Sequence, residues 1–335
     1  MPPRNHTVRR PGCGACWGST TVPVKRCRSS EKRSRGKLTW ERSRTCDPGA
    51  PGCAADIRDK PTPVWPRLLR LTAVSISFLD GGHRIRFSGT TDIGRVRDHN
   101  EDNLLLPHDM PLAVVSDGMG GHACGEVASG IAVQSIAEYY TATADGGLDS
   151  WPFRMPQLHV ERDRMTTSIK LANERIFQTG VADPSKKGMG CTVDAIFFCK
   201  GRIYVGHVGD SRVYRIRDGH ITMLTEDHSL LNDYKRMKDM SREEQENFAH
   251  KNVVVRALGL SESVFVDTVV EEFYLDDLYL LCSDGLSGML DDATMLAAAT
   301  RFNSIDTASA QLVKMANDAG GNDNITAVLA RVEAP

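Results

Sequence analysis

Residues 112–122 read LAVVSDGMGGH, an apolar run that ends abruptly in a carboxylate and a glycine-rich loop. The β-branched Val114 and Val115 favour a buried strand, and the glycines that follow do not allow it to continue. Asp117 therefore lies where a strand becomes a loop. A carboxylate held at such a rigid position suits metal binding or catalysis.

Acidic residues stand at four further element ends. Apolar runs precede Asp210 (residues 203–209) and Asp284 (residues 278–283), Asp323 lies in a glycine-rich turn, and Glu101 and Asp102 come just before an expected strand. A single Asp-Gly pair is ordinarily a turn, because Asp caps its own backbone and Gly accepts positive φ. Several acids on buried strands are different, since burying like charges is costly unless cations compensate for them.

This set of acids predicts a metal site and a reaction. An all-oxygen cluster selects hard cations such as Mg2+ or Mn2+ over zinc, and the ten histidines show no metal-ligand spacing in the expected folded part. Two such ions about 4 Å apart lower the pKa of a bridging water and stabilise in-line attack on a phosphoryl centre. Phosphoester hydrolysis is therefore indicated. Arg97, four residues before Glu101, is the candidate to bind two phosphate oxygens.

Composition indicates a folded body behind a basic N-terminal segment. With 335 residues and 41% hydrophobic content, the chain can build a sizeable core. Residues 1–60 hold 14 Lys and Arg against 5 Asp and Glu, whereas residues 61–335 hold 27 against 38. We expect residues 1–80 to be a basic, disordered tail without helix or strand periodicity, and residues 81–335 to be the catalytic domain.

The tail carries two weaker signals. Cys13 and Cys16, with His6 and Cys27 nearby, offer at most a zinc half-site, because a closed site needs a second ligand pair. The positive charge permits nucleic-acid binding, which we do not expect, because the tail interleaves few aromatic residues. We find no apolar run that fits a membrane helix or a secretion signal. The body's cysteines lie in apolar runs, as in a reducing compartment, so a cytoplasmic protein is expected.

Periodicity divides the body into strands and helices. Strands are expected at residues 85–87, 103–106, 112–116, 191–199, 202–208, 212–216, 221–224, 264–270, 278–282 and 325–332, and helices near 127–140, 165–176, 292–301 and 306–319. Consecutive strands joined by short turns favour antiparallel sheets over a doubly wound fold. The polar, highly charged residues 229–252 interrupt the strand series and are expected to form a flap.

Six motifs follow one another along residues 85–333. They are Thr91-Asp92-x-Gly94-x-x-Arg97-x-x-Asn100-Glu101-Asp102, Asp117-Gly-Met-Gly-Gly-His122, Gly188-Met-Gly-Cys-Thr192, Val208-Gly-Asp210-Ser211-Arg212, Ser283-Asp284-Gly285 and Asp323-Asn-Ile-Thr326. Together they resemble the metal-dependent protein serine/threonine phosphatases of the 2C type (the PPM family), bacterial branch. Six ordered motifs are not a pattern expected by chance.

The resemblance implies an α+β fold and a reaction. The fold would be a four-layer α-β-β-α sandwich, with two antiparallel β-sheets flanked by helix pairs and a metal centre at one end between the sheets. The enzyme would be a protein-serine/threonine phosphatase (EC 3.1.3.16), which hydrolyses phosphoserine and phosphothreonine with a water activated by two Mn2+ or Mg2+ ions. Its partners would be phosphoproteins and a cognate serine/threonine kinase, and we expect a monomer with no membrane or nucleic-acid partner.

The resemblance also implies a role for each motif residue. The implied metal ligands are Asp117, which would bridge both ions, Gly118 through its carbonyl, Asp284 and Asp323 on one ion, Glu101 or Asp102 on the other directly or through water, and Asp210 on a third, weaker ion. Arg97 would bind the phosphate. Residues 229–252 would shape access for the substrate.

Two positions depart from the family pattern. Cys191 stands where the family commonly has Thr, which affects packing more than metal binding. Eukaryotic members have a histidine general acid directly after the Asp-Gly pair, where this chain has Met119. His122 is the candidate replacement, although a loop histidine is also compatible with a purely structural role.

Two other functions fit parts of the sequence. Residues Gly118 to Ala123 match the relaxed G-x-G-x-x-G/A pattern of a dinucleotide-binding oxidoreductase, but that pattern requires a parallel strand after the helix and does not explain Asp284 or Asp323. The other alternative is a catalytically weak metal-binding regulatory module. All the family's metal positions are filled, which disfavours this alternative.

Overall fold

The computed structural model describes residues 76–119, 124–144, 157–241, 244–245, 248, 250 and 253–335. Every described residue belongs to one compact unit, Pro66–Pro335, the second of the two into which the chain divides. The expected tail up to residue 75, with the Cys13 and Cys16 pair, lies outside the described residues. So does His122 in the glycine-rich loop.

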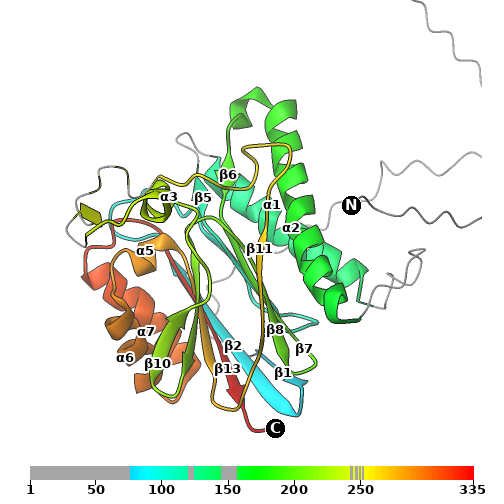
Figure 1. The fold of residues 1–335 in the computed structure, drawn as a ribbon, viewed down its shortest axis with the longest axis vertical. Coiled ribbons are helices and arrows are strands. Elements are labelled where there is room, and N and C mark those ends of the chain that lie inside the picture. Colours follow the sequence, from blue (N-terminus) through cyan, green and yellow to red (C-terminus); the bar gives the residue numbers. More distant parts are fainter. Residues whose placement is uncertain are drawn as a thin grey trace, which may run out of the picture. The chain divides into compact units, whose positions relative to one another are not determined.

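Two antiparallel sheets form the centre of the second unit (Figure 1). The first has the strand order β1 (Ile76–Asp80), β2 (His83–Asp92), β13 (Ile325–Glu333), β12 (Leu278–Cys282), β9 (Arg212–Arg217) and β10 (His220–Met223). The second has the order β11 (Asp267–Glu272), β8 (Arg202–Val208), β7 (Val193–Cys199), β4 (Leu112–Ser116) and β3 (Asn103–Leu105). A two-stranded pair joins β5 (Gly118–Met119) to β6 (Gly190–Cys191).

Helices cover the outer face of each sheet, as Figure 1 shows. The helices α1 (Gly125–Ala142) and α2 (Gln157–Ala182) pack on the sheet that contains β7 and β8, and α6 (Asp292–Arg301) and α7 (Ile305–Asp318) pack on the other. Shorter elements are the 3-10 turn η2 (Pro184–Lys186), α3 (Leu230–Met237) and the single turn α5 (Asp284–Ser287). The α+β four-layer sandwich expected from the resemblance is therefore present.

Three apolar layers hold these four layers together. One lies between the helices α1 and α2 and their sheet, one lies between α6 and α7 and theirs, and the third lies between the two sheets. Strands in the middle of this stack are buried on both faces, which explains why β4 is apolar at consecutive positions. Val114 packs toward the helices and Val115 toward the other sheet, as the two-residue period of a strand requires.

The structure corrects two element boundaries. The strand β1 (Ile76–Asp80) pairs with β2 over its whole length, so the folded unit begins at least five residues before the expected boundary at residue 81. The last strand before β12 spans Asp267–Glu272 rather than residues 264–270. Its start is set by pairing with β8, in which Asp267 faces His207, and not by the apolar residues that come before it.

The structure also contradicts the dinucleotide-binding alternative. All pairings among the described strands are antiparallel, and β4 lies between the antiparallel neighbours β3 and β7. Among the described residues, the element that follows α1 is the helix α2 and not a strand parallel to β4. The glycines after Asp117 therefore do not belong to a dinucleotide-binding βαβ unit.

The predicted flap, residues 229–252, is closed at its base by backbone contacts. Ser229 and Val254 form an isolated antiparallel bridge, and the Leu230 N–H donates to the Val253 oxygen at 2.9 Å. The helix α3 occupies the first part of the segment, and the Ser229 side chain accepts the Asn232 N–H at its start. The two ends of the flap are therefore fixed next to each other beside the sheet that contains β8.

Candidate metal centre

Asp117 occupies the point at which the chain changes from one sheet to the small strand pair. Its N–H donates to Thr192 Oγ1 at 3.0 Å, and its carbonyl accepts the Thr192 N–H at 2.8 Å. The chain then continues as β5, paired with β6. Two backbone anchors thus hold Asp117 at the end of β4, which is the rigid placement that the sequence pattern predicted.

Gly118 lies in a space that no other residue fits. A Cβ atom at this position would lie 2.3 Å from the Gly125 oxygen and 2.6 Å from the Glu101 oxygen. Gly125 is equally constrained, because its Cβ would lie 2.6 Å from Glu101 Oε2. These two glycines bring the start of α1 against the strand end and leave room for the Glu101 carboxylate beside them.

Most of the predicted site residues surround one open cavity of about 600 Å³. Those that line it are Arg97, Glu101, Asp117, Gly118, Asp210, Asp284 and Asp323. They come from loops and strand ends far apart in the sequence, and both sheets contribute. Asp102 does not line the cavity, and His122 lies outside the described residues. Met119 does line it, so a side chain without a transferable proton stands directly after the Asp-Gly pair.

Burial, together with the charges of neighbouring acids, raises the pKa values of the carboxylates. Burial, with the charges of Asp102 and Asp284, raises the pKa of Asp117 well above its usual range. Burial and the charge of Asp284 raise the pKa of Asp210 to about 7, and burial and Asp323 raise that of Asp284. Such repulsion is the condition under which a cluster of acids binds cations.

The donor set fits hard divalent cations. The Asp284 Oδ1 atom is buried and has no hydrogen-bond partner among the described residues, and a buried carboxylate oxygen is costly to leave unpaired. The cavity offers oxygen donors from Asp117, Asp284, Asp323 and Glu101, as Mg2+ and Mn2+ prefer. The residues present therefore match the ions that the acids indicated.

Asp102 lies behind the cavity wall. Its Oδ2 accepts hydrogen bonds from Ser283 Oγ at 2.8 Å and Thr326 Oγ1 at 2.6 Å, while its Oδ1 is buried without a partner among the described residues. Burial, opposed by these two hydrogen bonds, raises its pKa to about 7. Asp102 thus belongs to the same electrostatic cluster as Asp284 without facing the cavity.

Arg97 lies on a loop that Asn324 holds in place. The Asn324 side chain accepts the Glu101 N–H at 2.8 Å and donates to the carbonyls of Ile93 and His99 at 2.9 and 3.0 Å. The guanidinium of Arg97 donates to Asp323 Oδ2 at 2.7 Å and is half exposed. The Arg97 guanidinium and the Asp323 carboxylate at the cavity mouth are thus both positioned by residues at the start of β13.

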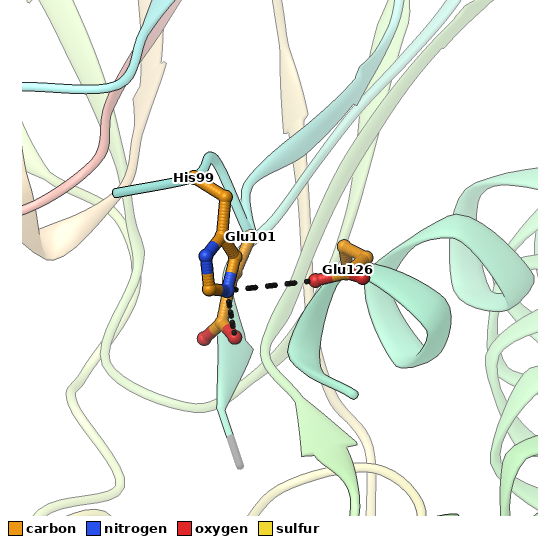
Figure 2. Close-up of side chains that lie close together, drawn as sticks. All are labelled: His99, Glu101 and Glu126. Carbon is orange, nitrogen blue, oxygen red and sulfur yellow. Dashed lines mark hydrogen bonds and ion pairs between the residues drawn. The ribbon is translucent and has the colours of Figure 1, made fainter. Parts of the chain in front are cut away.

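Figure 2 shows a second group of ligand atoms, formed by His99, Glu101 and Glu126, of which His99 and Glu101 line the cavity. His99 Nε2 lies 3.2 Å from Glu101 Oε1 and 3.8 Å from Glu126 Oε2. The three side chains could hold a metal ion, since their ligand atoms all lie within 4.8 Å of one another. The sequence reasoning missed His99 and Glu126, because no sequence spacing links the start of α1 to the loop before β3.

Sequence reasoning also missed the hydroxyl and amide groups that hold the acids. Thr192, Ser283, Thr326 and Asn324 each hydrogen-bond a predicted ligand or its backbone. The signal was available, because all four residues lie inside the six motifs. Their short polar side chains beside buried acids mark them as hydrogen-bond partners.

Comparisons with known proteins show which family this chain resembles. A protein-family model described as "Protein phosphatase 2C" matches residues 95–330. The serine/threonine phosphatase stp of Listeria welshimeri is 35% identical over 244 residues, which cover 71% of this chain and 92% of that protein.

Solved structures agree with this match. The serine/threonine phosphatase PstP/Ppp of Mycobacterium tuberculosis aligns with a TM-score of 0.65 at 31% identity, over 74% of this chain and 99% of that one. The catalytic domain of the serine/threonine protein phosphatase PstP in complex with two manganese ions aligns with a TM-score of 0.63 at 30% identity, over 74% and 98%.

Proposed function

The chain belongs to the protein phosphatase 2C family, and we propose that the carboxylates around its cavity carry the metal-dependent dephosphorylation of proteins that this membership entails. It is a bacterial-type serine/threonine protein phosphatase that uses Mn2+ or Mg2+. The observation that supports the site is the convergence of seven predicted residues on one cavity. The alternative of a catalytically weak regulatory module is not favoured, because the expected ligand positions are filled.

The proposed metal ligands divide by their place around the cavity. Asp117 would be shared by both ions, with the Gly118 carbonyl beside it. Asp284 and Asp323 would hold one ion, Glu101 would hold the other, and Asp210 would hold a third, weaker one. Asp102, which does not line the cavity, would support the ion held by Glu101 through a water. When bound, the ions supply an activated water and neutralise the phosphoryl oxygens. The raised pKa values of Asp117 and Asp210 support this assignment, since cations favour the charged forms.

Arg97 is proposed to bind the phosphate group of the substrate. Its guanidinium lines the cavity and is half exposed, so two of its N–H donors can face a phosphate oxygen pair. The ion pair with Asp323 at 2.7 Å orients the side chain toward the acids. A phosphate bound there lies next to the proposed ligands of the metal ions.

His122 is proposed as the proton donor to the leaving hydroxyl of serine or threonine. Met119, which follows the Asp-Gly pair, cannot supply a proton, and His122 lies three residues further along the loop. A matched test is His122→Gln, which should lower kcat and remove one arm of the pH profile. A profile that keeps both arms would assign the proton to another group.

The central test uses the full chain and a phosphothreonine peptide. We expect hydrolysis with Mn2+, loss of activity with a chelator, and a decrease of at least about 1000-fold in kcat for Asp117→Asn, which weakens electrostatic stabilisation at the reacting centre. Asp98→Asn is the matched control, since Asp98 lines the same cavity and has no proposed role. Activity retained in Asp117→Asn would refute the assignment.

Substrates of this enzyme are phosphoproteins, and we propose that a cognate serine/threonine kinase adds the phosphates that it removes. We further propose that it acts in the cytoplasm as a monomer. The four cysteines of the described residues, Cys124, Cys191, Cys199 and Cys282, are free thiols, which supports a reducing compartment. No helix among the described residues is long and apolar enough to cross a membrane. Sedimentation of the purified chain tests the monomer.

A further inference from the structure

A second cluster of titratable side chains lies beside the cavity, and the proposed reaction does not use it. Its members are Asp194, His207, His228, Arg256 and Asp267. The strands β7, β8 and β11 bring Asp194, His207 and Asp267 into direct register, while His228 and Arg256 lie just outside the two ends of the flap. Asp194, His207 and His228 are at most 5% exposed.

Obligatory acceptors fix the protonation of His207. Its Nε2 lies 3.0 Å from the Glu226 carbonyl oxygen, which can only accept, so Nε2 carries a proton. Its Nδ1 lies 2.8 Å from Asp194 Oδ1. Burial alone would lower the pKa of His207, but the charge and hydrogen bond of Asp194 raise it. His207 is therefore hydrogen-bonded at both ring nitrogens, to Glu226 through Nε2 and to Asp194 through Nδ1.

An obligatory donor fixes the opposite state for His228. The Gly209 N–H donates to its Nδ1 at 3.0 Å, so Nδ1 is unprotonated and the ring proton is on Nε2, which lies 2.9 Å from Asp267 Oδ2. Arg256 Nη1 also lies 2.8 Å from Nε2. With the ring proton on Nε2 this is a contact between two donors and not a hydrogen bond, and the guanidinium charge disfavours a second ring proton on Nδ1. Burial and the nearby charges of His207 and Arg256 lower the pKa of His228 to about 4.

His228 holds Gly209 from two directions. Besides the contact at Nδ1, the His228 N–H donates to the Gly209 oxygen at 2.7 Å. Gly209 has a φ of +121°, and a Cβ there would lie 2.5 Å from the Thr192 side chain. The turn that presents Asp210 to the cavity is thus held between Thr192 and His228. Thr192 also shares a hydrogen bond with Ser211 at 2.7 Å and anchors Asp117.

The flap is tied to the same residue. Ser229, at the start of the flap, follows His228 directly, and the Val255 N–H donates to the His228 carbonyl at 2.8 Å. Arg256 Nη1 lies 3.3 Å from Asp267 Oδ1, so the other end of the flap reaches the same carboxylate. His228 is therefore the residue through which both ends of the flap contact the turn that carries Asp210.

We propose that the neutral His228 is a positioning residue, which fixes the Gly209-Asp210 turn through its Nδ1 and thereby sets the affinity of the cavity for the cation that Asp210 holds. The inference rests on the proposed function, in which Asp210 is a metal ligand. Partners that orient metal ligands affect affinity as ligands do, though less strongly.

Two substitutions separate the ring nitrogens. In His228→Asn the amide oxygen lies near the position of Nδ1 and can accept the Gly209 N–H; in His228→Gln the amide reaches the position of Nε2 and leaves that N–H without its partner. We expect His228→Gln to weaken Mn2+ binding to its weakest site about tenfold, measured by equilibrium dialysis and by electron paramagnetic resonance of free Mn2+. His228→Asn should stay within about threefold of the unaltered protein.

Asp277→Asn is the control for general destabilisation. Asp277 is fully buried and pairs with Arg217 through two short contacts, at the opposite end of its sheet from Asp284. It should lower Tm and leave Mn2+ binding unchanged. The proposal fails if His228→Asn and His228→Gln bind Mn2+ alike, or if Asp277→Asn weakens binding as much as His228→Gln. Failure of the proposed function would appear differently, as phosphatase activity that persists in Asp117→Asn.

A measurement on the unaltered protein applies even if His228→Gln does not fold. Side-chain 15N resonances should show an unprotonated Nδ1 and a protonated Nε2 for His228 near neutral pH, and a protonated Nε2 for His207. The Gly209 amide should exchange slowly with solvent. A proton on Nδ1 of His228, or rapid exchange at Gly209, would overturn the proposal.

Discussion

Two site residues are distinguished by the hydrogen bonds that their side chains make or lack. One buried carboxylate oxygen of Asp284 has no hydrogen-bond partner among the described residues, whereas the Arg97 guanidinium donates one hydrogen bond to Asp323. The unpaired Asp284 oxygen lowers the stability of the metal-free protein, because unpaired buried oxygens are costly, and Arg97 is paired with a carboxylate that is itself a proposed metal ligand. Both arrangements suit side chains that bind a ligand in place of a protein partner. Functional sites commonly depart in this way from the arrangement that would be most stable.

Arg97→Ala should weaken substrate binding more than turnover. The loss of charge-assisted hydrogen bonds to phosphate predicts a decrease of about tenfold or more in kcat/KM, mostly through KM. Initial rates on a phosphothreonine peptide at saturating Mn2+ measure it. Arg95→Ala is the matched control, because Arg95 is exposed and bonds to Asn317 and Asp318 instead. An unchanged KM in Arg97→Ala would count against the phosphate role.

Glu126→Gln should weaken Mn2+ activation without changing KM for the peptide. The substitution removes a negative charge beside His99 and Glu101 (Figure 2), and we expect the Mn2+ concentration for half-maximal activity to rise about threefold. Glu138→Gln on the same helix is the control, since Glu138 pairs with Arg175 instead. Identical Mn2+ curves for the two variants would show that Glu126 does not contribute.

The helices, strands and loops that form this site contact one another at glycine residues. Because glycine has no side chain, their backbones approach closely there. The start of α1, the strand β5 and the loop that carries Glu101 converge at Gly118 and Gly125. The loop of Arg97 meets the start of β13 in the same way, since a Cβ on Gly94 would lie 2.2 Å from the Asp323 oxygen. Close backbone approach lets ligands from separate elements reach one cavity.

Two glycine substitutions on neighbouring elements should have opposite effects. Gly118→Ala places a Cβ against two backbone oxygens, and we expect a loss of about 1–3 kcal/mol of unfolding free energy, as for other overpacked sites. Gly130→Ala, inside α1, meets only Asn103 Nδ2 at 4.0 Å and should gain up to about 1 kcal/mol from helix propensity. Denaturant unfolding measures both. Equal effects would contradict the packing at Gly118.

The whole molecule is a stack in which both sheets contribute acids to one end. Asp117 and Asp210 follow strands of the five-stranded sheet, and Asp284 and Asp323 border strands of the six-stranded sheet. The apolar layer between the sheets keeps these strand ends at a fixed separation. The repulsion among the acids is then a property of the assembled sandwich and is absent from the unfolded chain.

Stability of the metal-free protein should therefore fall as the pH rises. Burial raises the pKa of both Asp102 and Asp210 to about 7, so the folded state binds protons more tightly than the unfolded chain. A carboxyl whose pKa is raised on folding stabilises fully below its ordinary pKa, near 4, and loses that contribution as the pH rises through the folded value. We expect Tm to fall by several degrees, of the order of 5 °C, across this window in the presence of a chelator.

Added Mn2+ should reverse this slope, because metal binding requires the deprotonated carboxylates and stabilises the folded state only. Thermal melts across the same pH range, with chelator and with Mn2+, provide the measurement. Asp210→Asn should flatten the slope of the chelated protein. A Tm that stays level from low to neutral pH in the chelated, unaltered protein would contradict the raised pKa values.

The sequence by itself predicted most of the strands, the four long helices and most of the residues that line the cavity. Apolar runs that end in Asp117, Asp210 and Asp284 identify buried strands and the acids at their ends, because periodicity and turn chemistry are local properties. The six motifs indicated the family and seven of the residues that line the cavity. They did not reveal that β1 starts at Ile76, since its place in the sheet comes from pairing with β2.

Only the tertiary structure determines which side chains contact the acidic residues and their loops, and which of the titratable groups carry protons. Nothing local in the sequence brings His99 to Glu126, or His228 to Gly209 and Asp267, because these contacts form only when separate strands and the flap pack together. The Gly209 N–H, which donates to Nδ1, leaves the ring proton of His228 on Nε2, and burial with neighbouring charge raises the pKa values of Asp102 and Asp210. Solvation and distance between charges are properties of the packed molecule, so the chain without its fold does not contain them.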